Sequence, residues 1–188
     1  MGRGMKQVKI KVSLLTLLVT ISLVACNGDI NNKTNTSKID EIDEITDIKE
    51  LVHEYSVGNY TNESASITSE ELIVTKQDGS EITYDLPEDE FFVSIAPFIE
   101  ATHPCKNHSL TGCQGEMVEK EFDIYIEDTD GNVILDHTMT SHANGFIDLW
   151  VPRNKTYHIT IEHDGKKVES EFSTFDSDGT CLTTMQLL

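Results

Sequence analysis

Apolar residues recur at every second position through most of the chain after Ser64. In the clearest example Phe122, Ile124 and Ile126 alternate with more polar residues, which is the pattern of a strand with one face in a core. Turn residues such as Asp-Gly separate these segments and favour hairpins. The expected strands are residues 72–75, 82–84, 91–98, 122–127, 133–139, 146–151, 156–162, 168–172 and 181–188. Short strands at this spacing predict a mainly β protein, an antiparallel β-sandwich or small open barrel.

One segment near the start of the patterned region has helical spacing instead. Its apolar positions, followed by a glycine at the expected C-terminal stop, are Ile45, Ile48, Leu51, Val52, Tyr55 and Gly58. This helix and the hairpin at Asp78-Gly79 form a small N-terminal α+β part, expected at residues 44–100. A β-rich C-terminal domain that contains the cysteines is expected at residues 101–188.

Two aromatic residues and one histidine of the β-rich region are expected inside the fold. Phe146 and Trp150 are of a size and type that fill a sandwich core. His137 shares the alternation of Val133 and Met139, which predicts an interior position with its polar atoms satisfied.

The first residues predict export. Basic residues precede an apolar run from Val12 to Val24, and residues 1–25 have the pattern of a signal peptide. The run is too short to span a membrane as a helix. It ends in Leu23-Val24-Ala25-Cys26, a lipobox in which the Cys26 thiol accepts a diacylglycerol. Residues 26–43 are polar, which predicts a flexible tether. We expect an extracytoplasmic protein that is anchored to the membrane by its lipid.

The charge of the chain limits its partners. The formal net charge is −19, with 33 acidic and 14 basic residues, and four of the basic residues lie in the predicted signal peptide. Nucleic acid is therefore excluded as a partner. Anionic lipid headgroups repel such a body, so contact with the membrane is expected only through the anchor.

Lipidation of Cys26 leaves three cysteines, Cys105, Cys113 and Cys181, an odd number for an oxidising compartment. The simplest interpretation is a structural disulfide between Cys105 and Cys113 with one thiol left over. Cross-linking of two chains is a second interpretation, and convergence of three sulfurs on a metal is a third. The spacing is not the Cys-x-x-Cys of thioredoxin-like redox proteins.

The segment around the first two of these cysteines is the best candidate for a metal site. Two cysteines and two histidines occupy eleven positions between His103 and Cys113, where a proline and a glycine favour a loop that can bring ligands together. Three thiolates form a soft set that prefers Cu(I). His103, His108 and Met185 are weaker candidates, and core filling is the preferred role of Met185. Zinc also fits, since Cys3His is a normal zinc ligand set.

Three ordered blocks of the sequence resemble the CueP family of extracytoplasmic copper-binding proteins. The blocks are His103-Pro104-Cys105 through Glu116, Ala143 to Arg153, and Ser173-Thr174-Phe175 with Thr180 to Leu187. The resemblance extends from about Leu72 to the C-terminus. It implies copper binding by Cys105, Cys113 and Cys181 in the service of copper resistance.

The resemblance also implies a wider role in copper handling. Family members are thought to buffer copper, to reduce Cu(II) to Cu(I), and to pass the metal to an extracytoplasmic enzyme such as a copper–zinc superoxide dismutase. Thiol reductases would then be partners. The predicted anchor at Cys26 departs from the best-known member, which is a soluble periplasmic protein.

These inferences predict a copper-binding lipoprotein that is not a turnover enzyme. Two thiols that reduce Cu(II) end as a disulfide, so the reaction is stoichiometric unless a partner re-reduces them. A disulfide-stapled immunoglobulin-like binding module without metal and a zinc-binding protein remain alternatives. A thiol oxidoreductase, which would act on disulfides without metal, is a third alternative.

Overall fold

The computed structural model describes residues 47–188. The predicted signal peptide, the tether at residues 26–43 and the lipidation site Cys26 lie outside this range. Within it, no helix is both long enough and apolar enough to cross a membrane. The strands fall into three sheets, and the strands outnumber the single helix as the alternation predicts. The mainly antiparallel β architecture is therefore confirmed.

The single helix of the described residues, α1 (Ile48–Val57), lies where the periodicity places it. Asp47 caps its first turn, because the Asp47 carboxylate accepts a hydrogen bond of 2.9 Å from the backbone N–H of Lys49. Gly58 ends the helix in extended backbone, with φ −77°. A side chain at Gly58 would collide with Tyr60 and with the Glu54 carbonyl, so glycine is needed here for space rather than for a left-handed turn.

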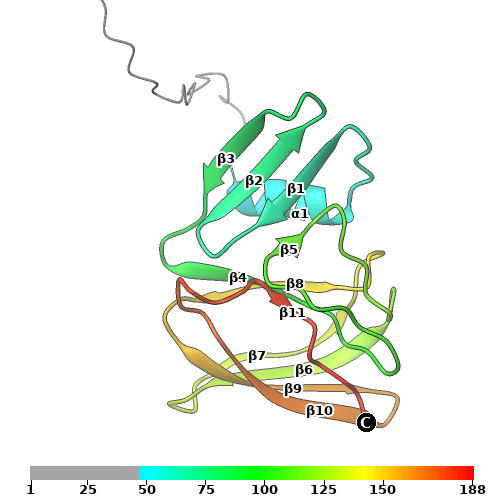
Figure 1. Cartoon of the computed structure of the whole chain (residues 1–188). Helices are drawn as coiled ribbons and strands as arrows, with labels where there is room; N and C mark the ends of the chain where they lie inside the picture. The colour runs from blue at the N-terminus through cyan, green and yellow to red at the C-terminus, as the bar shows by residue number, and fades with distance from the viewer. Residues whose placement is uncertain (1–46) are drawn as a thin grey trace, which may run out of the picture. The chain divides into compact units, whose positions relative to one another are not determined.

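The first sheet carries α1 on one face (Figure 1). Its strand order is β3 (Glu81–Asp85), β2 (Glu71–Lys76), β1 (Glu63–Ile67) and β5 (His108–Ser109). The hairpin between β2 and β3 turns at Gly79, whose φ is +82°, as the Asp-Gly pair predicts. Alternate residues of β1 and β2 are buried with the apolar face of α1.

The central sheet has the order β11 (Cys181–Leu182), β4 (Glu90–Ile95) and β8 (Ile147–Pro152). It lies between the other two sheets (Figure 1). Phe91 faces the large core below, and Phe92 faces the core under α1. Burial on both faces explains why β4 is an almost continuous apolar run instead of an alternating one. The strand ends at Ile95 instead of residue 98, because Pro97 has no N–H to donate to a neighbouring strand.

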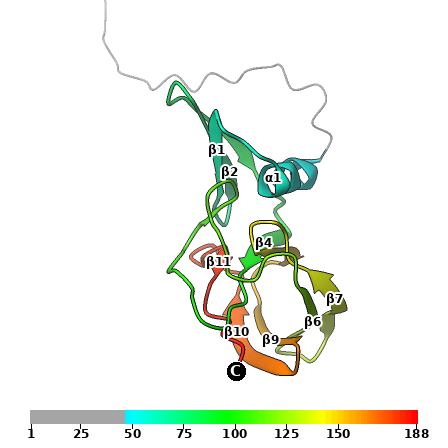
Figure 2. The same ribbon diagram turned by 90° about the vertical axis from the view of Figure 1, so that its right-hand side faces the viewer.

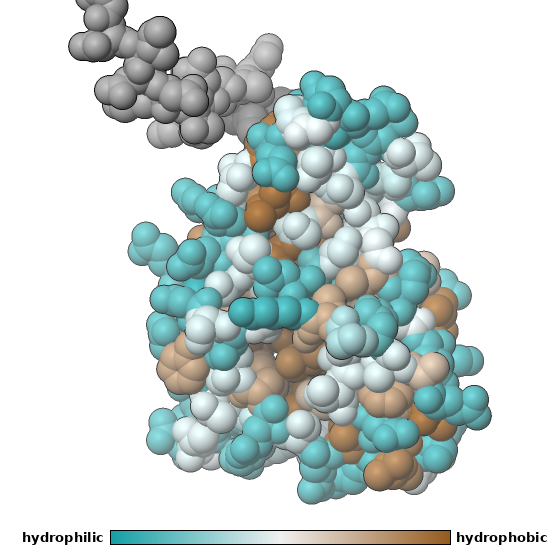
Figure 3. Space-filling model, in the orientation of Figure 1, coloured by the Kyte–Doolittle hydropathy of each residue, from teal (hydrophilic) through white to brown (hydrophobic). Residues whose placement is uncertain are grey.

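The third sheet encloses the large core together with the central sheet. Its strand order is β10 (Lys166–Ser173), β9 (Thr156–His163), β6 (Glu121–Asp128) and β7 (Val133–Thr140), all antiparallel. Figure 2 shows these strands with β4 and β11 around one interior. That interior is filled by the apolar positions of β4, β6, β8, β9 and β10. The outer face is polar, and hydrophilic side chains cover most of the face seen in Figure 3.

The part expected at residues 44–100 and the domain expected at residues 101–188 share two sheets. β4, which precedes residue 100, pairs with β8 and β11, which follow it. In the opposite direction, β5 leaves the later region and pairs with β1. Residues 47–188 all belong to one compact unit.

Three details of the sequence-based expectations are wrong. The final segment forms a strand only at Cys181–Leu182, and it pairs parallel with β4, with one further parallel bridge at Gln186. His137 is exposed although it lies opposite the buried Ile124, because β7 is the edge strand of its sheet. Trp150 is only half-buried and packs edge-on against Phe92, with 5.2 Å between ring centroids, outside the main barrel core.

Candidate metal centre

The long connection from β4 to β6 carries four of the candidate ligands, His103, Cys105, His108 and Cys113. Most of this connection is irregular, as its proline and glycine predict. Its one regular piece is β5, which contains His108 and pairs with β1. This pairing places His108 in the interior, where it is fully buried.

The C-terminal segment is hydrogen-bonded to the same connection. The backbone N–H of Cys181 donates to the Lys106 carbonyl at 3.1 Å, and the N–H of His108 donates to the Thr180 hydroxyl at 2.9 Å. The buried Thr180 hydroxyl in turn donates to the Ile67 carbonyl at 2.7 Å. A Cβ at Gly179 would lie 2.5 Å from the Lys106 carbonyl oxygen, so glycine permits this close approach.

These contacts bring all three predicted cysteines together. The sulfurs of Cys105 and Cys113 are 3.7 Å apart, and Cys181 Sγ lies 3.7 Å from His108 Nδ1. All three thiols are free, since a disulfide would require about 2.05 Å between sulfurs.

Two overlapping groups of ligand atoms result. His108, Cys113 and Cys181 form the inner group, and His103, Cys105 and Cys113 form the outer one. Within each group every ligand atom lies within 4.8 Å of the others. Cys113 belongs to both groups, so it is the centre of the site.

The surroundings of the sulfurs are apolar. Cys181 is buried with Ala96 and Phe146, and the half-buried Cys105 and Cys113 pack against them. The Phe146 ring lies 4.4 Å from the His108 ring and 6.4 Å from the His103 ring, measured between centroids. Phe146 is therefore a core residue, as expected, but the core that it fills is the wall of the cysteine site.

The thiols differ in acidity because they share hydrogen bonds. The hydrogen bond from Cys181, followed by those from His108 and His103, holds the pKa of Cys113 well below its usual range. The bond to Cys113 and then burial raise the pKa of Cys181. Burial also raises the pKa of Cys105. These surroundings favour the thiolate form at Cys113 over Cys105 and Cys181.

His108 has an unusual hydrogen-bonding state. Its Nδ1 faces Cys181, while Nε2 is the one buried side-chain nitrogen or oxygen without a hydrogen-bond partner among residues 47–188. Buried polar atoms are rarely left unpaired without a reason. A buried imidazole grouped with the sulfurs of Cys113 and Cys181 is suited to bind a metal ion.

Met185 lies in a different environment from the sulfurs. It is buried in the large core between the central and third sheets, and its carbonyl accepts a hydrogen bond of 3.0 Å from the N–H of Phe98. Regular strand pairing ends at Leu182, so the alternation that would place Met185 on the same face as Cys181 does not continue. This placement favours core filling.

Glu116 is a supporting residue to which sequence reasoning assigned no role. Its carboxylate accepts hydrogen bonds from the backbone N–H groups of Ile99, Glu100 and Ala101, at 3.1, 3.0 and 2.8 Å. These bonds, that of Ala101 first, lower the pKa of Glu116. They fasten the segment that leads into His103. The only sequence signal was an acidic residue three positions after Cys113.

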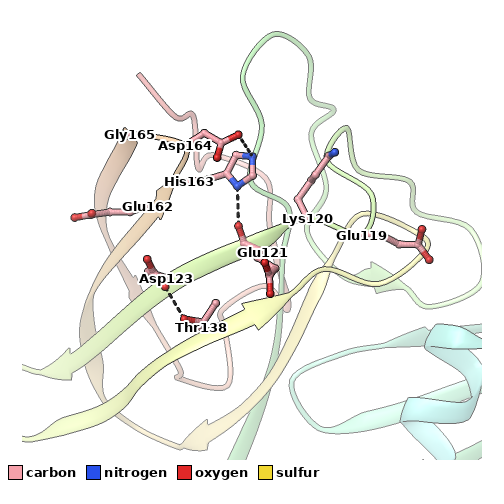
Figure 4. Close-up of a pocket in the computed structure, with 9 residues that line it drawn as sticks. All are labelled: Glu119, Lys120, Glu121, Asp123, Thr138, Glu162, His163, Asp164 and Gly165. Carbon is pink, nitrogen blue, oxygen red and sulfur yellow. Dashed lines mark hydrogen bonds and ion pairs between the residues drawn. The ribbon is translucent and has the colours of Figure 1, made fainter.

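A surface hollow lies away from the sulfurs. It measures about 490 Å³ and is lined by residues of β6, β7 and β9 with their adjoining loops, among them Glu121, Asp123 and His163 (Figure 4). His163 already contacts the Glu121 carbonyl at 2.7 Å and the Asp164 carboxylate at 3.4 Å. Thr138 donates to Asp123 at 2.6 Å. These contacts already occupy His163, Asp123 and Thr138, and no thiol lines the hollow.

Comparison with known proteins identifies the family of this chain. Residues 45–186 match the family described as periplasmic copper-binding protein CueP. The crystal structure of S.CueP superimposes with a TM-score of 0.73 at 37% sequence identity, covering 77% of this chain and 91% of that one. A search of curated proteins finds no match. The family match covers the first sheet, the central sheet and every candidate ligand, and the chain belongs to the CueP family of extracytoplasmic, copper-binding proteins.

Proposed function

We propose that this protein sequesters copper as Cu(I), with Cys105, Cys113 and Cys181 as its ligands. The observation that carries the proposal is that the three free thiols lie in two overlapping ligand groups joined by Cys113, although Cys181 lies far from the other two in sequence. Thiolates are the ligands that select Cu(I). The apolar wall formed by Ala96 and Phe146 keeps water from the metal and favours the ion of lower charge.

The histidines have different roles in this proposal. His108 completes the inner group, because it is buried beside Cys181 and has an unpartnered nitrogen. His103 is half-buried in the outer group, where an arriving ion meets it first. The same ligands suit zinc, but the copper-binding character of the family favours copper.

The paired sulfurs also support reduction of Cu(II). Two Cu(II) ions take one electron each, two in total, from the Cys105 and Cys113 sulfurs, which join in a disulfide. Any proton still on these sulfurs passes to water, and one of the two Cu(I) ions leaves the site. The 3.7 Å separation of the two sulfurs requires only a small movement for this bond to form. Cys181 and His108 then retain one Cu(I). A thiol reductase is needed to restore the pair, so the protein alone is not a turnover enzyme.

We further propose that the copper site is held at the membrane. A diacylglycerol on Cys26 and the polar tether at residues 26–43 would place the folded part outside the cytoplasm, attached by its lipid. The metal would be passed to an extracytoplasmic copper-requiring enzyme. These steps, together with the sulfur site, describe a protein of copper resistance.

An anaerobic competition titration tests the sulfur site. The wild-type protein and the triple variant with Cys105, Cys113 and Cys181 changed to Ser compete for Cu(I) with a chromophoric chelator. We expect the triple variant to lose at least about two orders of magnitude in affinity, since even residues that only support a metal ligand contribute roughly 10–100-fold. Met185→Leu is the control and should retain the wild-type affinity.

Equal affinity of the triple variant and the wild type would refute the proposal. If the wild-type protein retains zinc but loses Cu(I) to a weak chelator, zinc and not copper is its physiological metal.

A further inference from the structure

A second set of candidate metal ligands surrounds Asp148 of β8. The Asp148 side chain is only 9% exposed. Its carboxylate accepts hydrogen bonds of 2.5 Å from the hydroxyls of Ser56 and Ser94. Within residues 47–188, the one basic group within 4 Å of this carboxylate is the imidazole of His142, whose Nε2 lies 3.8 Å from Asp148 Oδ2. A buried carboxylate thus faces no lysine or arginine that would neutralise it.

A second imidazole adjoins the first. The rings of His53 and His142 are 5.7 Å apart between centroids, at an interplanar angle of 63°. His53 precedes Ser56 by three residues on α1, so both side chains lie on one side of the helix. Since metal–nitrogen distances are about 2.0 Å, two imidazoles on one ion have centroids roughly 4.5 to 6.5 Å apart. The observed spacing lies in this range. The ligand atoms of His53, His142 and Asp148 do not all lie within 4.8 Å of one another, so a rotation of the exposed His53 side chain must complete the site.

These ligands lie on the same face of the central sheet as the sulfur site. Cys181 is directly opposite Ser94, and Ser94 is directly opposite Asp148, so the three form one row across β11, β4 and β8. Residues directly opposite on neighbouring strands point to the same face. With strands about 4.8 Å apart, the backbones of Cys181 and Asp148 are separated by about 10 Å.

The two ligand sets differ in chemical character. Two imidazoles and a carboxylate form a nitrogen and oxygen set that suits Cu(II), whereas three sulfurs suit Cu(I). Because His53 is exposed, an ion from solvent reaches this set directly. We propose that His53, His142 and Asp148 form a second metal site, which takes Cu(II) from solvent next to the sulfur site. This inference rests on the proposed copper function.

Cu(II) binding to the triple Cys→Ser protein tests this site without reduction by the thiols. Electron paramagnetic resonance should show one Cu(II) with nitrogen ligands, and adding His142→Asn should lower the Cu(II) affinity at least tenfold. His158→Asn is the matched control, because His158 is an exposed histidine of β9 that pairs with Glu171, and it should leave the affinity unchanged. Circular dichroism and thermal unfolding establish that each variant is folded.

The outcomes separate this proposal from that of the sulfur site. A nitrogen signal that survives His53→Asn/His142→Asn but disappears with His103→Asn/His108→Asn would overturn the second site, as would an absence of Cu(II) binding. Neither result changes the Cu(I) titration of the wild-type protein. If the wild-type protein did not bind Cu(I) in that titration, only the proposal of the sulfur site would be overturned.

Discussion

The chemistry of the site is set by which of three neighbouring thiols carries the negative charge. Cys113 is the shared member of both ligand groups, and the thiol of Cys181, followed by the imidazoles of His108 and His103, lowers its pKa and favours its thiolate form. Cys181 is held neutral by the same bond and by burial. The site is thus prepared for a cation, because one ligand is already charged and the other two lose their protons as the metal binds.

Selective alkylation tests this assignment in the copper-free, reduced protein. With substoichiometric iodoacetamide at pH 6, we expect Cys113 to be modified first, because the thiolate is the reactive form and its pKa is lowered. Cys105 should react only as the pH rises, since its pKa is raised, and the buried Cys181 should react last. Peptide mass spectrometry measures the order. Preferential labelling of Cys105 at pH 6 would contradict the assignment.

The elements around the site are fixed by close backbone contacts. Gly115, just after Cys113, donates from its N–H to the Asn144 carbonyl at 2.6 Å. A Cβ on Gly115 would lie 2.6 Å from the carbonyl oxygen of Gly145. Gly145 itself has φ +79°, a conformation that glycine adopts without strain. The loop that carries Cys113 therefore rests directly on the loop that enters β8.

Gly115→Ala should separate these two loops. Overpacking of this kind costs about 1–3 kcal/mol, and the shift of Cys113 should lower the Cu(I) affinity roughly tenfold, equivalent to about 1.4 kcal/mol. The control is Gly131→Ala, where φ is +82° but no atom lies within 4 Å of the added Cβ. It should lower the melting temperature without changing the affinity. Equal affinities for both variants would show that the loop contact does not position Cys113.

The turn between β6 and β7 makes the fold sensitive to acid. Asp128 is 2% exposed, and its carboxylate accepts hydrogen bonds from Lys155 at 2.6 Å and from Asn132 at 2.9 Å. Lys155 first, and then Asn132, lower the pKa of Asp128. A native pKa below the unfolded value of about 3.9 gives stabilisation that is present above that value and is lost as the pH falls through the native pKa.

Thermal unfolding of Asp128→Asn at pH 7, 5 and 3 checks this sign. At pH 7 the variant should melt several degrees below the wild type. This difference should shrink towards pH 3, because the Asp128 carboxylate of the unfolded chain becomes protonated and the ionised carboxylate then stabilises the native state less. Asp130→Asn, at an exposed neighbour in the same turn, is the control and should have little effect. A difference that is independent of pH would show that the Asp128 charge is not responsible.

The elements of the fold were largely predictable from sequence, because strand alternation and turn residues are local signals. The helix, the hairpin at Gly79 and most strands of the third sheet lie at the expected positions. The final segment was not predictable, since its short parallel pairing with β4 depends on a partner far along the chain. The exposure of His137 depends on the edge position of β7 in its sheet, which alternation alone does not reveal.

At the scale of the whole folded part, the central sheet unites the site. Ser94 of β4 pairs with Cys181 of β11. Ala96, just after the end of β4, packs against Cys181. The cysteines could be named from composition, compartment and family resemblance. Their meeting point could not, because it depends on hydrogen bonds such as that between Cys181 and Lys106, which no local pattern specifies.

X-ray absorption at the copper edge of the anaerobic protein with one equivalent of Cu(I) tests the central claim most directly. The account predicts a first shell dominated by sulfur in the wild type, and one sulfur fewer in Cys181→Ser, because that residue supplies a ligand from a distant part of the chain. A first shell of nitrogen and oxygen only, or a sulfur count unchanged by Cys181→Ser, would contradict it.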